Sequence, residues 1–162
     1  MPEHIPDGDE VSRHLFEPSM KKPGGDLWWE NVFMFKSDRS HAESVVWNRY
    51  AASLAEVHAL GCYKQRQDRA AGKSKATYFG AIHANVGEIR GLRSKNGIRF
   101  DVVHEPKEGP HHAHIKYEFH NRAPTPNDKS ELKVLLRKKF SNPPSGHMCP
   151  EEVKIAGPKQ RP

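Results

Sequence analysis

"IRFDVVHEPKEGPHHAHIKYEF", residues 98–119, carries the clearest strand pattern of the chain. At both of its ends, apolar and polar residues alternate with the period of two that is typical of a half-buried β-strand. Between the ends, Pro106, Gly109 and Pro110 predict a rigid loop. We therefore expect two neighbouring antiparallel strands, each with one face on a core and one face toward solvent.

The alternation assigns each side chain of these strands to a face. The core face is expected to hold the apolar members, which are Ile98, Phe100, Val102, Ala113, Ile115, Tyr117 and Phe119. The outward face is expected to hold the polar members, which are Arg99, Asp101, Glu105, His112, His114, Lys116 and Glu118. Five of the chain's eleven histidines lie within residues 102–120. The outward face is therefore the candidate functional surface.

Together with the patterns on either side, these two strands predict one α+β domain over residues 27–140. Its sheet is expected to have three or four antiparallel strands, with two helices packed on the core face. Aromatic and β-branched residues predict strands at 27–36, 77–83 and 86–92, and a turn is expected at 95–97.

The two helices are predicted from their caps. Ser40 and Glu43 form a capping-box pattern and Gly61 resembles a C-terminal cap, which together predict a helix at 41–60. Thr125 followed by Pro126 predicts the start of a second helix at 126–140.

The ends of the chain are expected to lie outside this domain. Proline and glycine in residues 1–26 predict an irregular N-terminal arm, and residues 141–162 lack apolar periodicity and predict a mobile, disordered tail. No signal-peptide pattern or membrane-length apolar run is present, so no membrane partner is expected. Cys62 and Cys149 lack CxxC spacing and make no disulfide framework, which favours a reducing, cytoplasmic compartment.

The charge of the chain favours a polyanionic partner. Lys and Arg number 26 against 20 Asp and Glu, for a net charge of +6, and this surplus favours nucleic acid, either RNA or DNA. Clustered cations contact phosphates without base-specific geometry. The expected substrate-binding residues are Lys64, Arg66, Arg69, Lys73, Arg90, Arg93, Lys129, Lys133 and Arg137.

The outward histidines suggest metal-independent cleavage of RNA. One imidazole of His112 and His114 would take the proton of the attacking 2′-hydroxyl, and the other would protonate the leaving oxygen. Lys116, on the same face, would stabilise the charge of the pentacoordinate phosphorane. This chemistry requires no cofactor.

Several alternatives stay open from the sequence. His112 and His114 with Asp101 or Glu105 would suit zinc, manganese or iron in a metal-dependent hydrolase, although Lys116 in the same row would repel a cation. The face is equally consistent with an ordinary solvated sheet surface with cross-strand ion pairs.

Non-enzymatic roles are open as well. The chain would then be a non-catalytic module that binds nucleic acid or a protein, with an oligomeric state that the sequence does not define. Walker loops, dinucleotide fingerprints, G-x-S-x-G elbows and zinc-finger spacings are absent from the sequence. An ADP-ribosyl or phosphoryl transferase built from scattered Arg, Tyr and Glu remains compatible, because such a site leaves no local spacing.

Overall fold

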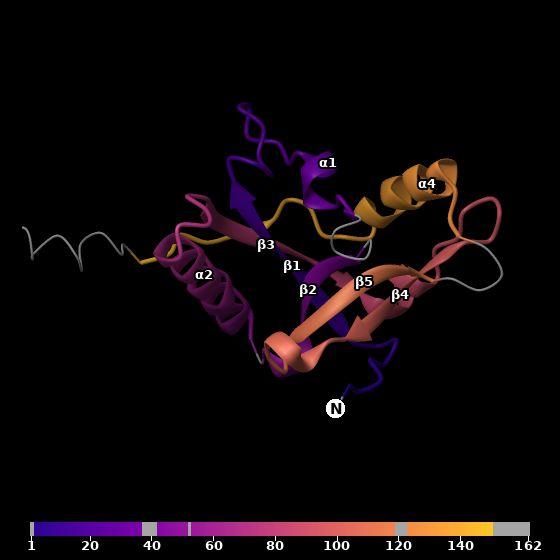
Figure 1. Ribbon diagram of the computed structural model, residues 1–162, viewed down its shortest axis with the longest axis horizontal. Helices are drawn as coiled ribbons and strands as arrows, with labels where there is room; N and C mark the ends of the chain where they lie inside the picture. Colours follow the sequence, from indigo (N-terminus) through magenta and orange to yellow (C-terminus); the bar gives the residue numbers. More distant parts are fainter. Residues whose placement is uncertain (1, 37–41, 52, 119–122, 151–162) are drawn as a thin grey trace, which may run out of the picture.

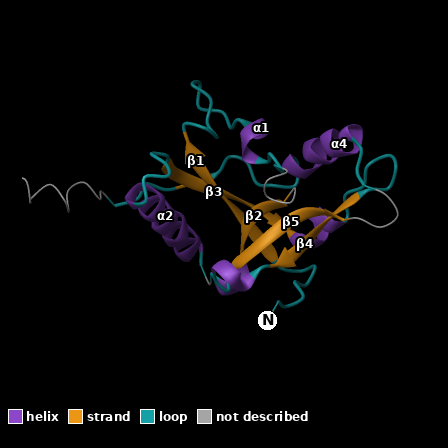
Figure 2. Ribbon diagram, in the orientation of Figure 1, coloured by secondary structure: helices purple, strands orange, loops and turns teal. Residues whose placement is uncertain are grey.

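The computed structural model describes residues 2–36, 42–51, 53–118 and 123–150 (Figure 1). The described residues form one six-stranded antiparallel sheet in the order β4-β5-β2-β1-β3-β6, accompanied by four α-helices (Figure 2). The strands are β1 Glu10–Glu17, β2 Ala42–Trp47, β3 Thr77–Asn85, β4 Arg99–His104, β5 His112–Glu118 and β6 Ser145–Gly146. The helices are α1 Trp29–Val32, α2 Leu54–Ala70, α3 Val86–Arg90 and α4 Pro126–Arg137. The fold is α+β, but the predicted sheet of three or four strands is too small.

Helices cover both faces of the sheet, as two successive residues of β2 show. Val45 belongs to the main core, which also contains Leu132 and Leu136 of α4. Val46 belongs to a second, smaller cluster with Val57 of α2. Since successive side chains of a strand point to opposite faces, α4 and α2 lie on opposite sides of the sheet. The prediction that both helices share the core face is therefore wrong.

The predicted irregular N-terminal arm is also wrong, because it contains β1. This strand lies between β2 and β3 in the sheet, and its pairing with β3 runs from Glu10↔Asn85 to Glu17↔Thr77. Val11 and Leu15 are completely buried in the main core. The prolines of the arm flank an eight-residue segment that contains no proline or glycine, so turn signals on both sides concealed a central strand.

The helix expected at 41–60 divides into a strand and a later helix. Residues 42–47 form β2, whose β-branched and aromatic residues pair with β1 on one side and β5 on the other. The α2 helix begins only at Leu54, where the Ser53 side chain accepts a hydrogen bond from the Glu56 amide. Gly61 lies inside this helix instead of capping it. Tertiary pairing of 42–47 therefore overrides the local capping pattern, and Ser40 itself lies outside the described residues.

The segment at 27–36, expected as a strand, contains the short helix α1. The backbone amides that follow this helix do not join a ladder. The Oε1 atom of Glu43 accepts hydrogen bonds from the amides of Met34 and Phe35, at 3.1 and 2.8 Å. A buried carboxylate thus takes the place of a partner strand, and sequence periodicity carries no signal for such a contact.

The segment at 86–92 is likewise helical rather than extended. Asn85 caps α3, and its side chain accepts a hydrogen bond from the Glu88 amide at 2.9 Å. The expected turn at 95–97 is present, with the Gly97 amide donating to the Ser94 carbonyl at 2.9 Å. This turn joins α3 to β4 instead of joining two strands.

The second predicted helix starts at the expected residue. Thr125 and Asp128 form a reciprocal capping box, Pro126 is the first helical residue, and Leu132 and Leu136 are buried. The helix ends at Arg137, three residues before the predicted end.

The C-terminal segment up to residue 150 is part of the fold. β6 pairs with β3, and Cys149 forms a disulfide with Cys62 of α2. The predicted mobile tail is therefore wrong for 141–150, and its remainder, 151–162, lies outside the described residues. The expectation that the cysteines make no disulfide framework is also wrong. The partners are 87 positions apart in the sequence, so no local spacing could indicate the pairing.

Candidate functional site

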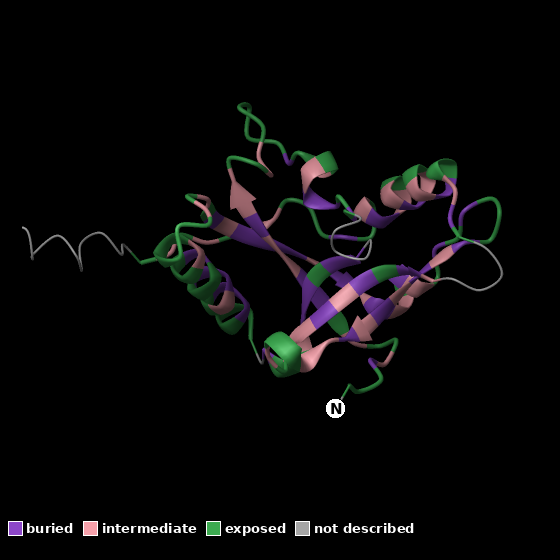
Figure 3. Ribbon diagram, viewed as in Figure 1, coloured by how far each residue is buried: buried purple, intermediate pink, exposed green. Residues whose placement is uncertain are grey.

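The predicted faces of β5 are confirmed. Ala113 and Ile115 are completely buried and Tyr117 is 2% exposed, whereas His112 and His114 are partly exposed. Figure 3 shows this alternation along β5. The core-facing residues of β4 are likewise buried as expected. Phe119 lies outside the described residues.

A cavity of about 240 Å³ lies beside the histidine face. The α2 helix packs against β3 and β1, and β5 lies two strands away from β1 in the sheet. The cavity lies between the helix and this part of the sheet. Its walls come from β1, β2, α2 and the segment that leads into β5. The lining residues are Arg13, His14, Phe16, Ser44, Val45, Val46, Leu60, Tyr63, Lys64, Gln67, Glu108, His111 and His112.

His112 lines this cavity with a defined ring orientation. Its Nδ1 atom lies 3.0 Å from the Glu105 carbonyl oxygen, and because a carbonyl only accepts, Nδ1 carries a proton. Its Nε2 atom lies 3.2 Å from Ser44 Oγ and 3.4 Å from the Glu108 carboxylate. The Nε2 atom is therefore the position from which His112 can exchange a proton with a ligand.

His112 contacts the ring of His114, and its charge affects the pKa of both His114 and His111. The rings of His112 and His114 meet edge to face, with centroids 4.7 Å apart. Burial lowers the pKa of His114, and the positive charge of His112 lowers it further. The same two causes lower the pKa of His111. Both effects favour the neutral form of His111 and of His114, which is the form that a general base needs.

His14 adds a fourth imidazole to the region. Burial lowers the pKa of His14 to about 4, so it is neutral at pH 7. Its Nε2 atom lies 2.8 Å from the Val57 carbonyl and therefore donates to it. His14 was not among the predicted site residues, because the prolines and glycines of residues 1–26 predicted an irregular arm instead of β1. Its alternation with Val11 and Leu15 was the signal that could have revealed it.

Of the predicted catalytic residues, only His112 lines the cavity. His114 lies behind it, in contact with its ring. Lys116 is exposed farther along β5, where it pairs in register with Ala42 and Asp101. Lys64, expected to bind substrate, does line the cavity, and its Nζ atom lies 3.4 Å from the carboxylate of Asp68.

The remaining predicted cations of α2 and its following loop lie on the outer surface. Arg66 is exposed with its guanidinium above the Tyr63 ring. Arg69 donates to the Ala76 carbonyl and to Thr77 Oγ1. Lys73 is exposed in the loop.

The other predicted cations do not extend the cavity. Arg90 forms ion pairs with Asp7 and Asp101 at 2.8 and 2.9 Å. Arg93 donates to backbone carbonyls next to α3. Lys129, Lys133 and Arg137 belong to α4, on the opposite side of the sheet. The predicted binding cations therefore do not form one continuous patch.

The alternative metal ligands are engaged elsewhere. The carboxylate of Asp101 accepts hydrogen bonds from the Arg90 side chain and the Val102 amide. Glu105 contacts His112 through its backbone carbonyl rather than its carboxylate. Within the described residues, the cluster of metal-ligating side chains lies elsewhere, at Cys62, His147 and Cys149.

The outer part of the face matches an ordinary solvated sheet surface. Arg99 and Glu118 are opposite each other on β4 and β5, with a guanidinium to carboxylate distance of 2.6 Å. The cross-strand ion pairing that the sequence left open is thus present at this end of the strands. The histidine end differs because it opens into the cavity.

Comparison with known proteins gives no further guide to the site. No protein-family model matches the chain, and neither a curated protein nor a solved structure is detectably similar to it. Over the described ranges, none of the helices combines the length and apolar character needed to cross a bilayer.

Proposed function

We propose that the protein binds RNA in the cavity between α2 and β5 and cleaves its phosphodiester bonds without a metal ion. The observation that carries this proposal is the cluster of imidazoles at the cavity, with His112 Nε2 at the wall and the pKa of His111 and of His114 lowered. Burial lowers the pKa of His111 and of His114, which favours the neutral imidazole that a general base requires.

The chemistry assigns the acid to His112 and the base to His111, which also lines the cavity. Neutral His111 takes the proton of the 2′-hydroxyl, whose oxygen attacks the adjacent phosphorus. Protonated His112 gives its Nε2 proton to the departing 5′-oxygen. The products are a 2′,3′-cyclic phosphate and a free 5′-hydroxyl, and each histidine ends in the protonation state in which the other began.

In this assignment the general base is His111, and no longer His114 as an alternative partner of His112. His114, expected from the sequence as the second catalytic histidine, becomes a neighbour that positions the His112 ring by contact. Lys64, on the α2 wall of the cavity, takes over the role expected for Lys116 of stabilising negative charge on the phosphorane. The net charge of +6 favours approach of a polyanion. The cytoplasmic location stays a prediction from the sequence.

The test uses a labelled single-stranded RNA and the DNA of the same sequence, both in the presence of EDTA. Cleavage of RNA alone is expected, because DNA lacks the attacking 2′-hydroxyl. H112Q and H111Q are each expected to lower the rate about 100-fold to 10,000-fold, the usual effect of losing a general acid or base. His4→Gln, at an exposed histidine outside the cavity, is the matched control and should retain full activity.

Three outcomes would contradict the proposal. Activity that disappears in EDTA and returns with zinc or manganese would require metal chemistry. Salt-sensitive binding of RNA without any cleavage would reduce the protein to a binding module. Equal rates for H112Q and wild type would remove His112 from the chemistry.

A further inference from the structure

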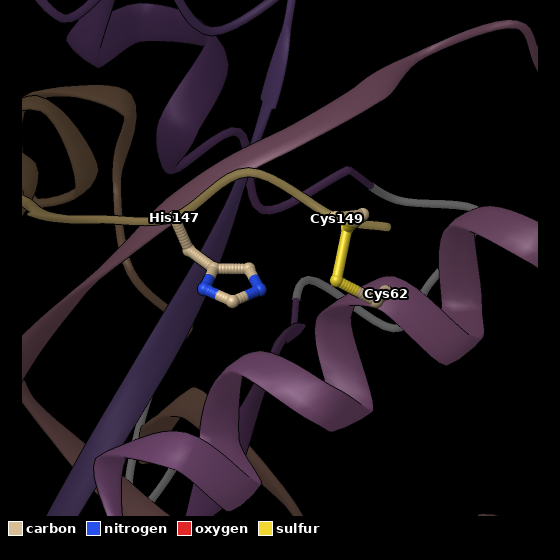
Figure 4. A group of neighbouring side chains, drawn as sticks. All are labelled: Cys62, His147 and Cys149. Atoms are coloured by element: carbon tan, nitrogen blue, oxygen red, sulfur yellow. A yellow bond between two sulfur atoms is a disulfide. The ribbon is translucent and has the colours of Figure 1, made fainter. Parts of the chain in front are cut away.

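Cys62, His147 and Cys149 bring two sulfur atoms and one imidazole nitrogen together on the α2 side of the sheet. These ligand atoms all lie within 4.8 Å of one another. Cys62 comes from α2, and the other two come from the segment that follows β6. Figure 4 shows the His147 ring beside the two sulfurs, with all three side chains gathered between that segment and the helix.

The backbone around these residues is held by contacts other than the disulfide. β6 pairs with β3, and the His147 amide donates to the Phe79 carbonyl at 3.0 Å. On the other side, α2 packs closely on β3 at Gly61, next to Cys62. The two chain segments therefore stay close together when the two sulfurs are not bonded to each other.

The donor set is suited to a borderline-soft cation. Thiolate sulfur and imidazole nitrogen are the ligands that zinc prefers, and two cysteines with one histidine leave the fourth tetrahedral position to solvent. His58, one turn before Cys62, does not fill that position. Its ring stacks on His147 at a centroid distance of 4.5 Å and an angle of 10°, and a metal in the plane of one imidazole lies well outside the plane of a parallel neighbour.

We propose that Cys62, His147 and Cys149 form a zinc site that replaces the disulfide when the disulfide is reduced. A dithiol reductant transfers two electrons and two protons to the disulfide, giving two cysteine thiols and the oxidised, cyclic reductant. Zinc then binds both sulfurs and displaces their two protons. With a Zn–S distance of about 2.3 Å, tetrahedral geometry separates the two sulfurs by roughly 3.8 Å, a movement that the two side chains can supply by rotation.

Each form of the site keeps the segment after β6 attached to α2. Disulfides persist in oxidising compartments, whereas thiols prevail in the cytosol. The zinc form would therefore take over the same structural link wherever the disulfide is reduced. This inference is independent of the chemistry proposed for the His112 cavity.

The test is a titration of the phosphine-reduced full chain with Co²⁺, which substitutes for Zn²⁺ and is coloured. At one equivalent we expect thiolate-to-cobalt charge-transfer absorption with the visible bands of tetrahedral cobalt, and both should disappear on adding Zn²⁺. The oxidised protein should show neither. H147Q retains both cysteines, so its oxidised form serves to verify folding.

In the reduced state, H147Q is expected to weaken Co²⁺ binding by more than the roughly 10- to 100-fold typical of losing an outer-shell partner. C149S should abolish the charge-transfer band, and His4→Gln should bind as wild type does. A reduced wild type without these bands, an oxidised protein that binds equally well, or H147Q with unchanged affinity would each overturn the proposal.

Discussion

Gly61 of α2 lies directly against the ring of Tyr78 of β3. A Cβ atom at position 61 would stand 2.5 Å from Tyr78 Cε1, well inside the distance at which Cβ atoms contact other heavy atoms. Tyr78 is only 1% exposed, so its ring has little room to move away. The contact between Gly61 and Tyr78 therefore sets the distance between α2 and the sheet beside the smaller hydrophobic cluster of Val46 and Val57.

G61A is therefore expected to destabilise the protein despite the better helix propensity of alanine. Alanine gains about 1 kcal/mol in a helix interior, whereas overpacking a rigid contact costs about 1–3 kcal/mol and more where nothing can shift. Because the buried Tyr78 ring has little room to shift, the upper end of the overpacking cost applies, and the free energy of unfolding measured with urea should fall by about 2 kcal/mol net. Gly8→Ala, which meets no atom within 4 Å, is the control and should stay within about 0.5 kcal/mol. A G61A variant as stable as wild type would refute the close contact.

Two buried tyrosines allow a matched test of how much a hydrogen bond to a buried hydroxyl contributes to stability. The Tyr78 hydroxyl lies 2.6 Å from His58 Nδ1. In the part of the chain that the structure describes, the buried Tyr117 hydroxyl has no hydrogen-bond partner. Y117F should leave stability unchanged or raise it by up to about 1 kcal/mol, whereas Y78F should lower it by about 1 kcal/mol. Thermal unfolding of both variants checks the sign, and a loss with Y117F would mean that its hydroxyl is bonded after all.

The parts of the fold that could be predicted carry their signal within one element. The alternation of β4 and β5 gave the buried face of Ile115 and the partly exposed face of His112, and Thr125 gave the start of α4. Both signals are local and agree with the tertiary structure. The same alternation placed His112 on the face of β5 that borders the cavity.

The parts that could not be predicted depend on distant contacts. Residues 42–47 became a strand because β1 and β5 flank them, and β1 was missed because its burial requires both neighbours. The cavity was invisible for the same reason, since His14 and Lys64 reach it from different elements. Disulfide pairing across 87 residues has no local signature at all.

Glu43 illustrates such a distant contact and should be essential to stability. Its carboxylate is 2% exposed, accepts two backbone amides through Oε1 and pairs with Arg13 at 2.8 Å. E43Q would remove the negative charge that lies 2.8 Å from the partly buried Arg13 guanidinium. The loss of stability should be about 3 kcal/mol or more in urea unfolding, as for other broken buried pairs.

The matched control for Glu43 is an exposed ion pair of the same chemistry. Glu17 and Lys21 pair at 3.3 Å, and each side chain is 39% exposed. E17Q should therefore change the free energy of unfolding by less than about 1 kcal/mol. Equal losses for E43Q and E17Q would show that burial of Glu43 does not set the strength of its contacts.

His14 should make the stability of the protein sensitive to acid. Burial lowers its pKa to about 4 in the folded protein, against about 6.5 in the unfolded chain. Between these two pH values the unfolded chain binds more protons than the folded protein. The contribution of neutral His14 to the free energy of unfolding is therefore complete above pH 6.5 and declines as the pH falls toward 4. The full difference corresponds to roughly 3 kcal/mol.

Urea unfolding at pH 7, 5.5 and 4.5 should show a smaller acid-induced loss for H14Q than for wild type, because glutamine can still donate to the Val57 carbonyl but does not titrate. His4→Gln, at an exposed position, should follow the wild-type curve, and parallel curves for H14Q and wild type would show that His14 is not buried in its neutral form.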